Sequence, residues 1–195
     1  MDKPDDSVTR RGVLQAGGAM AATALPQAAK AAQPVGPVMA ALSSYMAAAR
    51  DRVLPDAVIE KTKYHVLDTL AAMISGADLL PGQSAIKFAR SYGGEKIATV
   101  VASDVLCGPI EAALANGVLA HADETDDSHA PSLSHPGCAV VPAALAVGEQ
   151  LGIDGTHFLR AVALGYDVGT RMTMTLGVPA LSRCQAVMPE DCCAV

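Results

Sequence analysis

The chain of 195 residues is poor in aromatic side chains and in positive charge. It has no tryptophan, two phenylalanines and four tyrosines, but 37 alanines. A β-sandwich draws on aromatic and β-branched residues, so this composition favours helices packed on helices. The net charge of −6 argues against a nucleic-acid binder. A charged fraction of 17% and a mean hydropathy of +0.30 argue against wholesale disorder.

The sequence also lacks the cysteine patterns of common metal and disulfide sites. Its five cysteines form no CxxC pair and have no metal-ligand spacing, and neither HExxH nor an EF-hand pattern is present. An odd number of cysteines is poor support for a disulfide framework. We interpret Cys107 and Cys138, which stand among apolar and small residues, as small core residues. The last dozen residues hold the other three cysteines, Cys184, Cys192 and Cys193.

The first 31 residues are typical of an export signal. Arg10 and Arg11 form an arginine pair, which is followed by a stretch free of charge from Gly12 to Ala29. Small residues around Ala31 then provide a cleavage site. The arginine pair resembles the twin-arginine signal, so we expect export of a folded protein to the periplasm and cleavage near Ala31. A disordered or amphipathic tail is the alternative; a membrane anchor is disfavoured because the run is short and rich in Gly and Gln.

Apolar residues at helical spacing, with prolines and glycines at the boundaries, predict six helices in one all-α domain over residues 35–180. We expect the helices near residues 37–50, 55–76, 82–92, 110–122, 137–151 and 155–176. In the fourth helix, Leu114, Val118 and Leu119 should face inward. The fifth is apolar almost all round, which is typical of a buried helix. Residues 98–102 predict at most one small strand.

The loop between the fourth and fifth helices, HADETDDSHAPSLSHPG, concentrates acidic charge. Residues 97–159 contain no Lys or Arg but eight acidic residues, half of them within 123–127. The loop acids and the histidines around them are Asp123, Glu124, Asp126, Asp127, His121, His129 and His135. A charge run alone is typical of a solvated loop. Because helices hold this one at both ends, crowding should raise some carboxyl pKa values toward those useful for proton transfer.

His135 stands immediately before Pro136, at the start of the predicted buried helix. The free N–H groups and the positive dipole end at that point could hold a substrate carboxylate. They would also keep the imidazole neutral, so that it could act as a base. The carboxylates and histidines of the loop could instead hold a divalent metal ion. Because no known metal motif is present, we favour a site without metal.

Four segments resemble the MmgE/PrpD family in order and spacing. They are YHVLDTLAAMISGAD (64–78), GGEKIATVVAS (93–103), AALANGVLAHADETDDSHAPSLSHPGCAVVPAALAVGE (112–149) and DGTHFLRAVALGYDVGTRM (154–172). The family includes 2-methylcitrate dehydratase, cis-aconitate decarboxylase and iminodisuccinate epimerase. The resemblance implies an all-helical N-terminal domain, usually followed by a smaller α+β lid domain. It also implies a cofactor-free active site between the two domains and a homodimeric assembly.

The resemblance further implies which residues form the site. Glu124, Ser128 and His135 stand at positions that line it, and they are the expected catalytic residues. The expected substrate-binding residues are Asp126, Asp127, His121, His129, Asn116 and Arg171. The two aspartates could brace the loop instead of reacting. Asn116 and Arg171 could equally make buried hydrogen bonds between helices.

The implied reaction removes a proton next to a carboxylate of a small di- or tricarboxylic acid, followed by loss of water, loss of CO2 or return of the proton. The negative charge that develops needs cations or hydrogen-bond donors, and the acidic segment supplies none. Family members bring them from a downstream Gly-rich segment, which residues 181–195 do not match. We therefore expect a truncated member without its lid, which lacks full activity when it is alone. A non-catalytic helical fragment and a periplasmic module that binds divalent metal are the alternatives.

Overall fold

The computed structural model describes residues 35–177. The predicted export signal (1–31) and the tail (181–195) therefore lie outside the described residues. The chain divides into two units, residues 1–40 and 41–195, and the first contributes only residues 35–40 to the described part. The contacts that form the core and the site all lie within the second unit.

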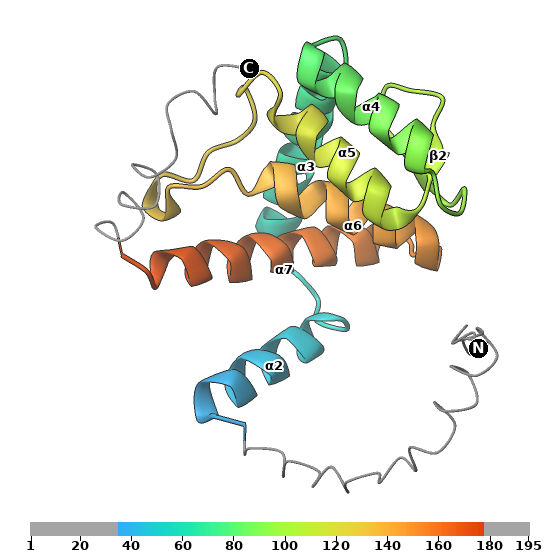
Figure 1. Cartoon of the computed structure of the whole chain (residues 1–195). Helices are drawn as coiled ribbons and strands as arrows, with labels where there is room; N and C mark the ends of the chain where they lie inside the picture. The colour runs from blue at the N-terminus through green and yellow to red at the C-terminus, as the bar shows by residue number, and fades with distance from the viewer. Residues whose placement is uncertain (1–34, 178–195) are drawn as a thin grey trace, which may run out of the picture. The chain divides into compact units, whose positions relative to one another are not determined.

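Six α-helices and one short 3-10 helix account for most of the described residues (Figure 1). In chain order they are α2 (Pro37–Ala49), α3 (Asp56–Gly76), α4 (Leu80–Tyr92), α5 (Pro109–His121), η2 (Ala130–Ser132), α6 (Gly137–Leu151) and α7 (Gly155–Met174). The predicted helical class is confirmed. Two short strands, β1 (Ala98–Thr99) and β2 (Leu106–Cys107), pair antiparallel between α4 and α5. Only a strand at β1 was predicted, because residues 98–102 contain a β-branched run, whereas neither residue of β2 is β-branched.

Proline and aspartate residues set the starts of three helices. Pro55 immediately precedes α3 in an extended conformation, and Pro109 is the first residue of α5, where its missing N–H costs no hydrogen bond. Asp154 caps α7, because its carboxylate accepts a hydrogen bond from the backbone N–H of His157 at 2.8 Å. These local signals explain why the helix boundaries follow the sequence pattern closely.

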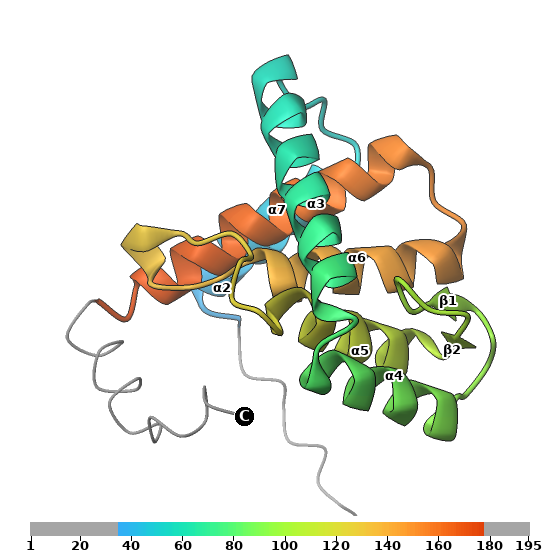
Figure 2. The ribbon, with the colours of Figure 1, turned by 90° about the horizontal axis from the view of Figure 1, so that it is seen from above.

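Helix α5 lies at the centre of the fold. It packs against α3, α4 and α6 and also contacts both strands (Figures 1 and 2). Its buried face is made mostly of small residues, with Leu119 as the one large apolar side chain. Small side chains let backbones approach closely: a Cβ added to Gly76 of α3 would overlap the carbonyl oxygen of Leu119. This close crossing positions the C-terminal end of α5, from which the acidic loop departs.

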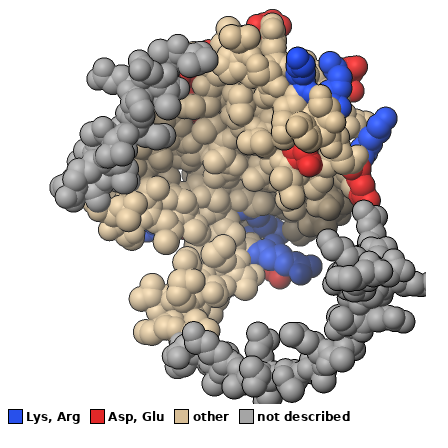
Figure 3. All heavy atoms as spheres, in the orientation of Figure 1, with Lys and Arg blue, Asp and Glu red and all other residues tan. Residues whose placement is uncertain are grey.

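Two packing predictions are wrong. Leu114 was expected to face the core, but 54% of its surface is exposed. Helix α6 was expected to be buried all round, yet Val147 and Leu151 are exposed near its C-terminal end, because α5 and α7 cover only part of its circumference. The face drawn in Figure 3 is formed mostly by uncharged residues. None of the helices within residues 35–177 is both long and apolar enough for a membrane span.

The close crossing of α3 and α5 gives the first prediction. Replacing Gly76 with Ala should lower the free energy of unfolding by about 1–3 kcal/mol, because the added methyl group meets a backbone carbonyl that cannot move without shifting a helix. Gly155→Ala is the matched control: it also lies in a helix, but nothing stands within 4 Å of its added Cβ. Urea unfolding followed by circular dichroism measures both. Equal stability of the two variants would show that the crossing is not tight.

Candidate active site

The acidic loop between α5 and α6 is held in shape by its own hydrogen bonds. The backbone N–H of His129 donates to the carbonyl of Ser134 at 2.9 Å, which closes the segment around η2. Inside this closed segment the buried hydroxyl of Ser132 lies 2.7 Å from His129 Nδ1 and 2.7 Å from Ser134 Oγ. His129, an expected substrate-binding residue, thus uses one ring nitrogen within the loop.

The loop brings Asp126 into contact with two histidines from its two ends. The Asp126 side chain has no exposed surface, and its Oδ1 lies 3.0 Å from His121 Nδ1 and 3.5 Å from His135 Nδ1. The two imidazole rings lie 5.1 Å apart, centre to centre. Both rings remain open to solvent, with 46% of the His121 side chain and 39% of the His135 side chain exposed. Three of the predicted site residues therefore form one cluster.

The hydrogen bond between His121 and Asp126 determines which nitrogen of the neutral His121 ring carries the proton. An ionised carboxylate can only accept hydrogen bonds, so His121 must donate through Nδ1–H, and its Nε2 then carries the lone pair. A buried aspartate that orients an exposed imidazole in this way is the arrangement that serves proton transfer in many enzymes. Among the described residues, no Lys or Arg pairs with Asp126, so the imidazoles are its cationic partners when they are protonated.

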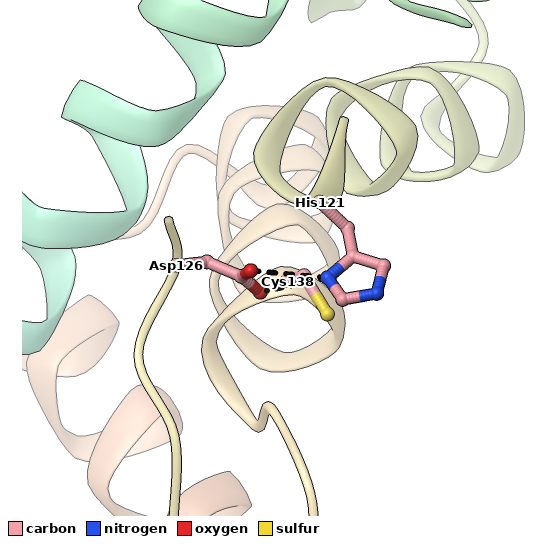
Figure 4. A group of neighbouring side chains, drawn as sticks. All are labelled: His121, Asp126 and Cys138. Atoms are coloured by element: carbon pink, nitrogen blue, oxygen red, sulfur yellow. Dashed lines mark hydrogen bonds and ion pairs between the residues drawn. The ribbon is translucent and has the colours of Figure 1, made fainter. Parts of the chain in front are cut away.

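Cys138 also borders the cluster, although it was not among the predicted site residues. It lies in the first turn of α6, three residues after His135. Its Sγ donates to the backbone carbonyl of His135 at 3.1 Å and lies within 4.8 Å of a donor atom of Asp126 and of His121 (Figure 4). Burial, followed by the negative charge of Asp126, raises the pKa of this thiol to about 11. In the sequence, Cys138 has the pattern of a core residue because its neighbours are small and apolar. The signal that could have found it is its helical spacing from His135, which places both at the same end of α6.

Asp127 makes contacts of a different kind from those of Asp126. Its Oδ1 accepts the backbone N–H of Gly137 at 2.9 Å, and its Oδ2 accepts the hydroxyl of Tyr166 at 2.8 Å. His65 Nδ1 of α3 also lies 3.3 Å from Oδ2. The pKa of Tyr166 is raised, mainly because its hydroxyl is buried and secondly because that hydroxyl is hydrogen-bonded to Asp127. The start of α6, which was expected to hold a substrate carboxylate, is thus occupied by the chain's own carboxylate, because Asp127 caps its first N–H.

The remaining loop acids are dispersed rather than crowded. Asp123 accepts a hydrogen bond from Ser75 of α3 at 2.5 Å and another from the Thr125 hydroxyl at 2.8 Å. These hydroxyls lower the pKa of Asp123, so for this residue the expected rise does not occur. Glu124 is exposed and has a left-handed backbone (φ 54°), which a non-glycine residue adopts only when its surroundings impose it. Ser128 is also exposed on the loop.

Two further predicted binding residues lie outside the cluster, as Asp127 and His129 do. Asn116 is fully buried in α5, where its amide accepts from the Val101 N–H and donates to the Thr99 carbonyl, both at 2.9 Å. It therefore ties α5 to β1 and the residues after it. Arg171 of α7 is exposed and pairs with Asp167 at 2.6 Å, one turn earlier on the same helix. A substrate contact of either residue stays a prediction.

These side chains lie in a part of the chain that matches a known domain. Residues 40–185 match the MmgE/PrpD N-terminal domain. The chain belongs to the MmgE/PrpD family. The resemblance drawn from the acidic loop and its flanking helices is thereby confirmed, and the mostly helical architecture agrees with it.

Several curated relatives are cis-aconitate decarboxylases. The chain is 28% identical to the cis-aconitate decarboxylase-like protein oryM of Aspergillus oryzae over 158 residues, which cover 77% of this chain and 33% of that protein. It is 28% identical to the cis-aconitate decarboxylase of Aspergillus terreus and 32% identical to that of Homo sapiens, each over 124 residues. These two matches cover 61% of this chain and 25% and 26% of the relatives. The chain therefore spans about a quarter to a third of their length.

The contacts of Asp127 give a second prediction. Asp127→Ala should lower the free energy of unfolding by about 2–4 kcal/mol, because each donor left buried without a partner costs about 1–3 kcal/mol. Glu124→Ala is the matched control, since it removes an exposed carboxylate from the same loop. Urea unfolding measures both variants. If Asp127→Ala is as stable as Glu124→Ala, Asp127 does not brace the three helices.

Proposed function

We propose that this chain provides the proton-transfer part of an MmgE/PrpD lyase or isomerase site. The substrate is a small di- or tricarboxylic acid, and the chemistry takes place at a carbon next to one of its carboxylates, as in a 2-methylcitrate dehydratase. The proposal rests mainly on one observation: the buried Asp126 carboxylate contacts two exposed imidazoles, those of His121 and His135. The names of the relatives add support, because cis-aconitate is a tricarboxylate of this class.

In this proposal His135 is the base that removes the substrate proton. Its ring is exposed at the start of α6, and Asp126 lies on its Nδ1 side, which leaves Nε2 free to face a bound acid. When the ring has taken up the proton, the buried carboxylate stabilises the imidazolium, so the charge that forms has a counterion already in place. For loss of CO2 the same imidazolium works in the opposite direction and protonates the carbanion that remains.

Glu124 and Ser128 are the other proposed catalytic residues. Both are exposed on the loop, where a carboxyl group and a hydroxyl could donate to a leaving hydroxide or to a substrate carboxylate. His121, held at 3.0 Å by Asp126, is proposed to bind the substrate next to His135. The cations that a di- or tricarboxylate requires must come from outside residues 97–159, which contain no Lys or Arg. Homodimer formation and export to the periplasm stay predictions.

Exchange of substrate protons for deuterium tests the proposal even if the complete reaction does not proceed. We expect the full chain in D2O to exchange the proton next to a carboxylate of 2-methylcitrate or of a related tricarboxylic acid, as followed by proton NMR. His135→Ala should slow this about 100-fold or more, which is what loss of a general base typically costs. His157→Ala is the matched control, since its imidazole pairs with exposed Asp154 at the start of α7.

The outcomes are distinct. Exchange at the rate of buffer alone with every acid, in a chain that shows a helical circular dichroism spectrum, contradicts the proposed function. If exchange survives in His135→Ala but is lost in His121→Ala, the proposed reaction stands and the base is His121 instead of His135.

A further inference from the structure

We propose that His121, Asp126 and Cys138 form a binding site for a transition-metal ion of the zinc class. The proposal goes beyond the acid chemistry above and does not depend on it. The three residues come from different parts of the chain: the last residue of α5, the acidic loop and the first turn of α6 (Figure 4). The site therefore exists only in the folded protein, because only the loop geometry brings the three side chains together.

The spacing of the donor atoms suits a single ion. One donor atom from each residue lies within 4.8 Å of the others, and the closest pair, His121 Nδ1 and Asp126 Oδ1, is 3.0 Å apart. A tetrahedral zinc ion with bonds of about 2.0–2.3 Å holds neighbouring donors roughly 3.4 Å apart. Binding of one ion therefore requires side-chain rotations that shorten the longest donor separation by up to about 1.4 Å.

The donor set selects the class of metal. One imidazole nitrogen, one sulfur and one carboxylate oxygen are the ligands of zinc and its transition-metal neighbours, whereas calcium and magnesium prefer several oxygens. An oxygen-rich site of the four loop acids is not assembled, because Asp123 and Asp127 are bonded to other groups and Glu124 is exposed. The fourth position of the proposed site opens toward solvent beside His135, whose Nδ1 is 3.5 Å from Asp126 Oδ1.

The electrostatics of Asp126 favour a cation. A buried carboxylate is stable when it is paired or when it binds a metal, and no Lys or Arg within residues 35–177 pairs with this one. When the ion binds, the Cys138 thiol loses its proton to solvent and the sulfur bonds to the metal. The Nδ1 proton of neutral His121 moves to Nε2 through solvent, so the ring keeps its charge while Nδ1 becomes a ligand. No electron transfer is involved, and binding releases one proton per chain.

Cobalt absorption tests the site directly. The tail thiols could also bind metal, so the titration uses the full chain with three substitutions outside the described residues: Cys184→Ser, Cys192→Ser and Cys193→Ser. We expect one Co2+ per chain, with the near-ultraviolet charge-transfer band of a cobalt thiolate, and loss of that band when Zn2+ is added. Absence of the band in a chain with a helical circular dichroism spectrum overturns the proposal.

Variants in the same background assign the ligands. Cys138→Ser and Asp126→Asn should each weaken Zn2+ binding, measured by equilibrium dialysis, at least about tenfold, because even the outer partners of metal ligands are worth that much. Cys138→Ala replaces the serine variant if that variant does not fold. His157→Gln is the matched control for His121→Gln, since His157 Nδ1 also lies 3.0 Å from an aspartate but belongs to no such three-donor group within residues 35–177. Unchanged affinity in the Cys138 and Asp126 variants overturns the proposal, as does equal loss in both histidine variants.

Discussion

The Asp127 carboxylate is the interaction on which the candidate site depends. It joins the first N–H of α6 to the Tyr166 hydroxyl of α7, and the His65 ring of α3 lies against it. Space at this point is so limited that a Cβ on Gly137 would stand 2.6 Å from the Thr69 hydroxyl and 2.9 Å from that of Tyr166. One charged side chain thus fixes the loop to three helices at once, which a loop rich in acidic residues could not achieve by apolar packing.

Asp126, the residue before Asp127, contacts a separate group of side chains. With Asp127 committed to α6 and α7, Asp126 is buried against His121, His135 and Cys138 instead. Two adjacent carboxylates with the same chemistry therefore have different roles, one in holding the fold and one in orienting reactive groups. The acid and metal proposals share this second group, and they exclude each other at one atom: His121 Nδ1 either donates to Asp126 or binds a metal.

The sequence predicted the helices well because the information for them is local. Pro55 and Pro109 mark helix starts, and the apolar spacing of each segment shows its period. The prediction was wrong where residues distant in sequence decide which face is covered. Leu114 has the pattern of a core residue, but 54% of its surface is exposed. The loop motif also indicated the family and the region of the site. It could not separate the roles of two adjacent aspartates, because those roles depend on Gly137, Tyr166 and the histidines that the fold places beside them.

The same limit explains why Cys138 was missed. Its functional surroundings consist of His121 and Asp126, which are 17 and 12 residues earlier in the chain. In sequence it has only small apolar neighbours, and these are typical of a core position. Apart from its spacing from His135, these contacts leave no periodic signal, because they close a loop, so the structure is needed to find them.

The central claim is that buried Asp126 orients the exposed imidazole of His121. Long-range nitrogen–proton NMR of the histidine rings tests it most directly, in metal-free protein at a pH where the rings are neutral. The account predicts that His121 carries its proton on Nδ1 in the unaltered chain and in Glu124→Ala, and that this preference is lost in Asp126→Asn. A His121 ring protonated on Nε2, or a tautomer that Asp126→Asn leaves unchanged, would contradict it.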